Sequence, residues 1–248
     1  MIDFVNEDCT CDFLSQIKKG TIVEEPWRHI LVDDIFCESC FDKILDSIES
    51  KNDTVHTLLR GSADEGALQY MNNTHGAAEG EFITKFRSDK LIQQWLDCTE
   101  YVYGFYPNAR KYDSVYCYPS ISRLNSGISW PIHDDAREKS ITMVIYMHPE
   151  KNLGTTLYST DTDYHHTTEW KPNRAKIFCP EHKVTWHGYA ADTESPVMRT
   201  TMTWFIQENL LHNKEDLYAK YGSEGKGDNY WKTVFDYIST KKCVKYFN

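Results

Sequence analysis

The sequence predicts one α+β domain in which helices precede a core of antiparallel strands and follow it. Three observations predict this class. Apolar residues at helical spacing dominate residues 1–110, short strand-like segments separated by Gly, Pro, Asn and Asp fill 111–207, and helical and polar sequence returns over 208–248. Strands separated in this way are typical of an antiparallel sandwich or jelly roll. We therefore expect a single domain over residues 1–248, with a jelly-roll core, N-terminal supporting helices and a helical C-terminal tail.

The N-terminal part is predicted to support the core. A short amphipathic helix is expected within residues 1–20, a strand at 29–34 with a helix after it, and a longer helix from 88 to about 103. Residues 51–82 are polar and rich in Gly, Asn and Asp, so we expect a long loop there. Long loops in compact domains are often functional, for example as lids.

The core strands are predicted from runs of β-branched and aromatic residues. These runs cover residues 114–118, 140–146, 155–158, 175–178 and 200–206. After Asn209 we expect helix and polar loop, and an apolar stripe that would dock this tail on the core consists of Tyr230, Trp231, Val234 and Phe235.

Composition and charge narrow the function classes. The net charge of −10 argues against a nucleic-acid partner, because phosphate binding usually leaves a basic stripe. No run approaches the ~18 apolar residues of a membrane span, and no apolar signal segment opens the chain. The eight cysteines are therefore interpreted as free, structural thiols of a cytoplasmic protein. The sequence does not predict an oligomeric state.

Two histidines and an aspartate have the spacing of a metal site. His133 and Asp135 are two residues apart in a predicted strand, so their side chains would share one face while Asp134 points away. His187 follows about fifty residues later, at a distance along the chain that suits a jelly roll. Two histidines and one carboxylate on one face of a metal leave the opposite face open, which suits non-haem Fe(II) and oxygen.

Arg199 adds a site for an anion. It begins a predicted strand twelve residues after His187, and its planar guanidinium can bind a carboxylate through two parallel hydrogen bonds. Thr201 lies two residues further on and shares its face. The pattern predicts an acidic cosubstrate next to the metal.

The segment from about 122 to 205 resembles the iron- and 2-oxoglutarate-dependent dioxygenases, and most closely their prolyl-hydroxylase-like branch. The resemblance lies in the order and spacing of five segments, with Leu153 replacing the first glycine of the family's Gly-Gly strand. These segments are Arg123–Gly127, Trp130–Asp135, Leu153–Leu157, Arg174–Phe178 and Arg199–Phe205. The resemblance covers about a third of the chain. It implies a double-stranded β-helix fold, with residues 111–207 as the catalytic core.

The resemblance also implies the site and the reaction. His133, Asp135 and His187 would bind Fe(II). Arg199, Thr201 and Tyr146 would surround the 5-carboxylate of 2-oxoglutarate, and Arg123 would line the mouth of the site. The implied enzyme hydroxylates an aliphatic C–H bond and converts 2-oxoglutarate and O2 into succinate and CO2, with ascorbate as a candidate reductant. No side chain beyond the metal ligands is expected to be catalytic.

The sequence leaves the substrate of such an enzyme open. A peptidyl proline is favoured by the branch resemblance, and a small molecule or sugar is the alternative, because substrate contacts come from variable loops. A nucleic-acid repair enzyme would usually carry a second arginine where this chain has Phe205. A non-catalytic jelly-roll binding module is the alternative from another class, although such modules normally lose a metal ligand or the arginine.

Overall fold

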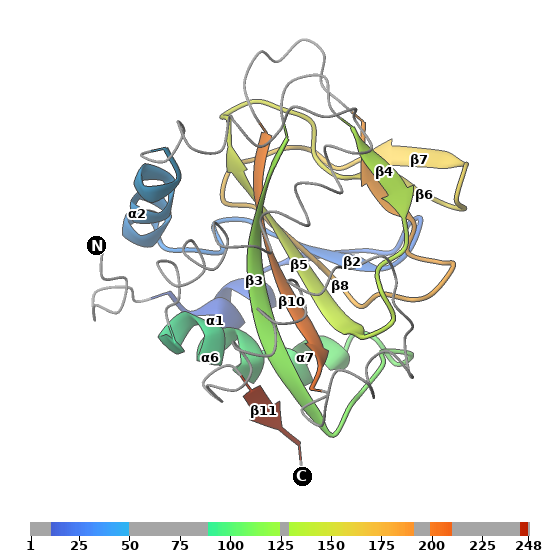
Figure 1. Ribbon diagram of the computed structural model, residues 1–248, viewed down its shortest axis with the longest axis horizontal. Coiled ribbons are helices and arrows are strands. Elements are labelled where there is room, and N and C mark those ends of the chain that lie inside the picture. Colours follow the sequence, from blue (N-terminus) through green and yellow to red (C-terminus); the bar gives the residue numbers. More distant parts are fainter. Residues whose placement is uncertain (1–10, 50–88, 125–128, 191–198, 210–243, 248) are drawn as a thin grey trace, which may run out of the picture.

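Two antiparallel sheets form the core of the computed structural model, which describes residues 11–49, 89–124, 129–190, 199–209 and 244–247 (Figure 1). The larger sheet has the strand order β1-β2-β8-β5-β10-β3-β11, and the smaller has the order β4-β9-β6-β7. The strands of the larger sheet are β1 (Thr21–Val23), β2 (His29–Val32), β3 (Ser114–Leu124), β5 (Lys139–His148), β8 (Ala175–Phe178), β10 (Arg199–Glu208) and β11 (Val244–Tyr246). Those of the smaller are β4 (Trp130–His133), β6 (Thr156–Tyr158), β7 (Tyr164–Thr167) and β9 (His187–Tyr189).

This strand order confirms the predicted jelly-roll core. From β3 to β10 the chain passes repeatedly between the two sheets, from β3 in the larger to β4 in the smaller and back to β5, and only the hairpin β6–β7 stays within one sheet. Each strand pair is antiparallel. Leu157 of the smaller sheet packs with Phe178 of the larger one, so the two sheets face each other across an interior.

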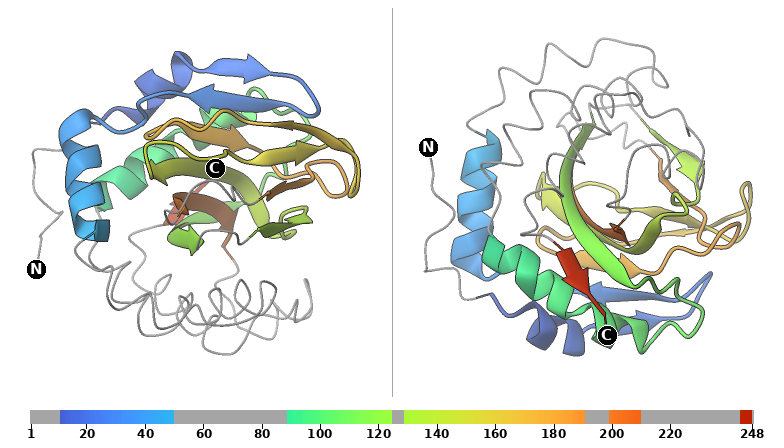
Figure 2. Two further views of the ribbon diagram at one scale, coloured as in Figure 1. Left: turned by 90° about the horizontal axis from the view of Figure 1, so that it is seen from above. Right: turned by 60° about the horizontal axis from the view of Figure 1, so that its bottom comes forward.

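Helices cover the outer face of the larger sheet. The covering helices are α1 (Phe13–Lys18), α6 (Asp89–Asp97) and α7 (Thr99–Tyr103), while α2 (Glu38–Glu49) stands at the side of the sheet and packs Ile44 into the same core. Their apolar residues, such as Phe13 and Trp95, join one core with strand residues such as Met143 and Trp204. Figures 1 and 2 show α1, α6 and α7 along this side of the sheet. The helix predicted from 88 to 103 is divided in two at Cys98.

Strand alternation divides the buried residues between two environments. On β5, Ile141, Met143 and Ile145 pack in the core beneath the helices, so Thr142, Val144 and Tyr146 point into the space between the sheets. The same alternation on β10 sends Arg199 and Thr201 inward, and on β8 it sends Lys176 and Phe178 inward. The interior face therefore carries the polar residues on which function can be built.

Strands at both ends of the described chain extend the larger sheet. The strand predicted at 29–34 is β2, and it pairs with both β1 and β8. The helical C-terminal tail is corrected at Val244–Tyr246, which form β11 on the edge of β3. Val and Tyr favour extended backbone, and the edge of β3 offers unpaired backbone groups. The predicted loop 51–82 and the stripe Tyr230–Phe235 lie outside the described residues.

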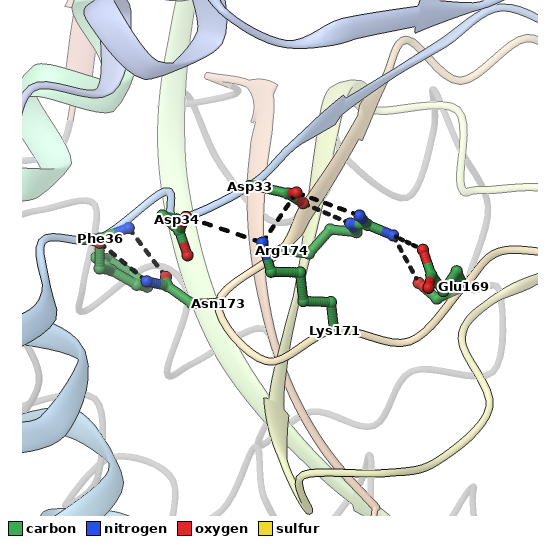
Figure 3. A network of polar contacts seen from close by, with 7 residues as sticks. All are labelled: Asp33, Asp34, Phe36, Glu169, Lys171, Asn173 and Arg174. Carbon is green, nitrogen blue, oxygen red and sulfur yellow. Dashed lines mark hydrogen bonds and ion pairs between the residues drawn. The ribbon is translucent and has the colours of Figure 1, made fainter.

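A polar network fixes the end of β2 against the start of β8 (Figure 3). The Asn173 side chain accepts a hydrogen bond from the Phe36 amide at 3.0 Å and donates one to the Phe36 carbonyl at 2.9 Å. Arg174 and Lys171 both bind Asp33, with nitrogen–oxygen distances of 2.6 and 3.0 Å. The Tyr146 amide donates to the Arg174 carbonyl at 2.9 Å, so this network also sets the position of the inward-facing end of β5.

One of the described cysteines, Cys40, departs from the predicted set of free thiols. The sulfur atoms of Cys11, Cys37 and Cys40 lie within 4.8 Å of one another, and Cys40 is disulfide-bonded. The Cys11 and Cys37 sulfurs are 3.1 Å apart. The fold brings these sulfur atoms close enough for disulfide formation, and the spacing of the cysteines along the chain did not indicate this. In this oxidised form the Cys40 sulfur is not available as a metal ligand.

None of the helices in the described ranges is both long enough and apolar enough to cross a membrane.

Candidate metal centre and anion site

The smaller sheet brings the predicted metal ligands together. His133 ends β4 and His187 begins β9, and the two residues are directly paired across these antiparallel strands. Their ring centroids are 4.3 Å apart. Asp135 joins them, so that the three possible ligand atoms lie within 4.8 Å of one another. The structure thus assembles a group of two imidazoles and one carboxylate from residues that the sequence separates by up to 54 positions.

Asp135 reaches this site in a way the sequence did not predict. We expected it on the same strand as His133, but β4 ends at His133 and Asp135 lies beyond it. Its carboxylate is held instead by β5, where the Thr142 hydroxyl donates to Oδ2 at 2.7 Å and the Lys139 ammonium binds Oδ1. Asp134 points away, as predicted, and accepts hydrogen bonds from His182 and the Lys183 amide.

Both histidines present the same ring nitrogen to the site. His133 Nδ1 lies 2.9 Å from the Pro131 carbonyl, and His187 Nδ1 lies 2.8 Å from the Thr185 carbonyl. Because a carbonyl can only accept, Nδ1 carries the proton in each ring and Nε2 keeps its lone pair. Metal-binding histidines are commonly oriented by such a backbone contact. The donor set therefore fits a divalent metal.

The charge states of these residues also suit a metal. Burial lowers the pKa of His133 and lowers that of His187 far below its ordinary value, so both rings are neutral. Burial alone would raise the pKa of Asp135, but the charge of Lys139 and the proximity of both histidines outweigh it and lower the pKa. Two neutral imidazoles and an ionised carboxylate are the forms that coordinate a metal.

Arg199 lies at another part of the same interior. Its side chain is buried, and its guanidinium carbon lies 4.1 Å from the Tyr189 ring centroid and 5.3 Å from that of Trp170. Its Nε donates to the Leu153 carbonyl at 3.3 Å. Within the described ranges no carboxylate forms an ion pair with Arg199. Burial lowers its pKa to about 10. A buried guanidinium in this setting fits the carboxylate of a ligand.

Tyr146 and Thr201 lie beside Arg199. Thr201 is buried and pairs with Tyr146 across β5 and β10. The Tyr146 ring stacks on Trp170 with centroids 4.7 Å apart, and its centroid is 6.0 Å from the Arg199 guanidinium carbon. The Tyr146 hydroxyl accepts from the Thr155 amide at 2.9 Å and donates to the Thr155 hydroxyl at 3.1 Å. The phenol is therefore already bonded to Thr155 while it helps to enclose Arg199.

Arg123 stays a prediction. Its backbone lies opposite Thr200 in the β3–β10 pairing, and its side chain is not among those described. In the other direction, sequence reasoning missed Lys139, Thr142 and Lys176. A signal existed for Lys176, since it is a lysine inside the otherwise apolar run 175–178. Lys139 and Thr142 follow Asp135 by four and seven residues, a spacing that carries no signal without the fold.

No family model matches the sequence, and no curated protein matches it either. Among solved structures, the chain is similar to a prolyl-4-hydroxylase from Pseudomonas putida (TM-score 0.42, 11% identity, 79% of this chain and 93% of that one). It is also similar to a prolyl 4-hydroxylase from Phytophthora capsici (TM-score 0.45, 13% identity, 86% and 80%). A third is SnoN, a non-haem α-ketoglutarate-dependent epimerase of nogalamycin biosynthesis (TM-score 0.45, 9% identity, 79% and 82%).

Proposed function

We propose that this chain is an Fe(II)- and 2-oxoglutarate-dependent dioxygenase that hydroxylates an aliphatic C–H bond. One observation carries the proposal. The interior between the two sheets holds both the group His133, Asp135 and His187 and the buried Arg199 guanidinium. A metal group alone would suit many metalloenzymes, and a buried arginine alone would suit many anion sites. The combination suits a cosubstrate that chelates a metal at one end and carries a carboxylate at the other.

In this proposal the side chains of the protein bind iron and 2-oxoglutarate and orient them. The two Nε2 atoms and the Asp135 carboxylate would hold iron on one side, which leaves the other side for ligands. Arg199 would bind the 5-carboxylate of 2-oxoglutarate, with Tyr189, Trp170 and Tyr146 excluding water around it. Iron with bound 2-oxoglutarate supplies the oxygen chemistry, in which one atom of O2 enters succinate as CO2 leaves and the other enters the C–H bond. No side chain is required as a general base.

The substrate we propose is a peptidyl proline. This choice is supported by the sequence resemblance of segments 123–127, 130–135 and 153–157 to the prolyl-hydroxylase-like branch. Hydroxylation of a small molecule or sugar is the alternative within the same reaction class.

The experiment that tests the reaction class measures succinate formed from 2-oxoglutarate by the iron-loaded protein with a panel of proline-containing peptides. Oxygenated peptide is identified in the same samples by mass spectrometry. The matched control is His182→Ala, which removes an exposed histidine bound to Asp134 and should retain activity. His187→Ala and Arg199→Ala should abolish succinate formation. Equal succinate formation by Arg199→Ala and the wild type would contradict the proposal, because a metalloenzyme that does not bind 2-oxoglutarate has no need of that guanidinium.

A further inference from the structure

Lys176 is buried inside the fold in a setting that is costly for an ammonium group. It lies on β8 and is 0% exposed. Its Nζ lies 5.2 Å from the Trp27 ring centroid and 5.1 Å from that of Phe178, and no hydrogen-bond partner for it exists in the described part of the chain. Burying a charge without a partner costs considerable free energy, and two aromatic faces offset only a part of that cost. The unpaired, buried Lys176 side chain is therefore a candidate for binding a ligand.

The strand pairing places Lys176 between the two parts of the candidate site. On β5 the inward-facing residues follow in the order Thr142, Val144, Tyr146, and Thr142 binds Asp135 while Tyr146 lies beside Arg199. Lys176 is paired with Val144, the middle one of these positions. A molecule that extends from the metal ligands to Arg199 would therefore pass the position of Lys176.

The rings around Lys176 connect it to the metal group. Phe178 and Trp27 pack against the His187 ring, with centroid distances of 5.1 and 6.3 Å. Both rings also flank the Lys176 ammonium. The aliphatic chain and ammonium of Lys176 are thus placed next to the wall that positions a metal ligand.

The charged residues of the interior would stabilise a negatively charged ligand. Lys176 interacts electrostatically with Asp135, which favours the ammonium, and with Arg199, which opposes it. Asp135 already binds Lys139, and bound iron would take up its remaining charge. The Arg199 guanidinium and the Lys176 amine then remain to meet the negative charge of a ligand. Burial lowers the pKa of Lys176 far below its ordinary value, so an anion that enters would also restore its proton.

We propose that Lys176 is a second cationic contact for the cosubstrate, near its metal-chelating carboxylate, while Arg199 binds the 5-carboxylate. This inference rests on the proposed function and assigns a cosubstrate-binding role to a residue outside the metal group. It predicts that loss of the Lys176 amine weakens 2-oxoglutarate binding although Arg199 is intact.

A purely structural role for Lys176 predicts a different result for one substitution. Lys176→Met keeps a long apolar side chain against Trp27 and Phe178 and removes only the charge. If the ammonium served stability, this variant would unfold more easily than the wild type. If the amine serves an anion, the ligand-free variant should unfold at a higher temperature, because a buried polar group without a hydrogen-bond partner has been removed.

The test combines unfolding temperature with calorimetric titration of 2-oxoglutarate into protein loaded with redox-inert Zn²⁺. The variants are Lys176→Met, Arg199→Met and the control Lys171→Met, whose half-exposed ammonium binds Asp33 on the outside. We expect Lys176→Met to unfold at a higher temperature and to bind 2-oxoglutarate about 10- to 100-fold more weakly. Lys171→Met should bind like the wild type.

The outcomes separate this inference from the proposed function. Wild-type affinity in Lys176→Met together with loss of binding in Arg199→Met would overturn the role of Lys176 and leave the proposed function intact. A lower unfolding temperature with unchanged affinity would identify Lys176 as structural. Absence of 2-oxoglutarate binding to the zinc-loaded wild type would overturn the proposed function and this inference together.

Discussion

His29 should make the stability of the metal-free protein fall steeply in acid. The residue is 0% exposed on β2, and its Nδ1 donates to the Trp27 carbonyl at 2.9 Å. Burial, reinforced by the charges of Lys176 and His166, lowers its pKa to about 4, against ~6.5 for an unfolded chain. Between these values the unfolded chain binds a proton that the folded protein does not, so stability is lost as pH falls. A difference of about 2.5 units corresponds to ~3 kcal/mol between pH 7 and pH 4.

The perturbation is His29→Phe, which keeps a ring against Trp27 and cannot bind a proton. Urea unfolding with a chelator present, at several pH values between 7 and 4, gives the free energy of unfolding of both proteins. His133 and His187 contribute equally to both, so they cancel in the comparison. Relative to the wild type, the variant should gain ~3 kcal/mol between pH 7 and pH 4. Parallel pH profiles would refute this reasoning. His165→Gln, at an exposed position, should follow the wild type.

Two other substitutions test the support of the site. Thr142→Val removes the hydroxyl that binds Asp135 at 2.7 Å and should weaken zinc binding about 10- to 100-fold in a chelator competition. Thr203→Val changes another buried threonine, on β10, and should leave zinc binding unchanged. Equal effects of the two substitutions would contradict a specific role for Thr142. Gly154→Ala would place a Cβ 2.0 Å from the Thr168 carbonyl oxygen and should lower the free energy of unfolding by about 1–3 kcal/mol in urea. Gly104→Ala, where the nearest atom is 3.1 Å away, should change it by less, and the reverse order would contradict the packing described at Gly154.

Much of the core could be predicted because its strands repeat with a period of two. The runs 140–146 and 200–206 became β5 and β10, and their alternation correctly separated the core-facing side from the interior. Strand ends were less predictable. The strand predicted at 114–118 continues to Leu124, because its pairing with β10 extends over that whole length. Pairing between distant segments decides such ends, and no local pattern records it.

In the candidate site, too, the spacing of residues along the chain identified the ligands, but contacts between distant segments could not be predicted. Spacing along the chain was enough to select His133, Asp135, His187 and Arg199, and the fold brings the first three together. The reason given for Asp135 was wrong, because hydrogen bonds from β5, and not strand alternation, place its carboxylate. Lys176 escaped prediction because a lysine in a strand is ordinarily exposed, and only the packing of both sheets shows that this one is buried.

In the proposed function, the interior between the two sheets binds iron and 2-oxoglutarate together. Anaerobic titration of the Fe(II)-loaded protein with 2-oxoglutarate tests it most directly, through the weak visible metal-to-ligand charge-transfer band that chelation produces. We predict a saturable band in the wild type and none in His133→Ala, while His182→Ala should behave like the wild type. A folded, iron-loaded wild type that gives no band at saturating 2-oxoglutarate would contradict the account.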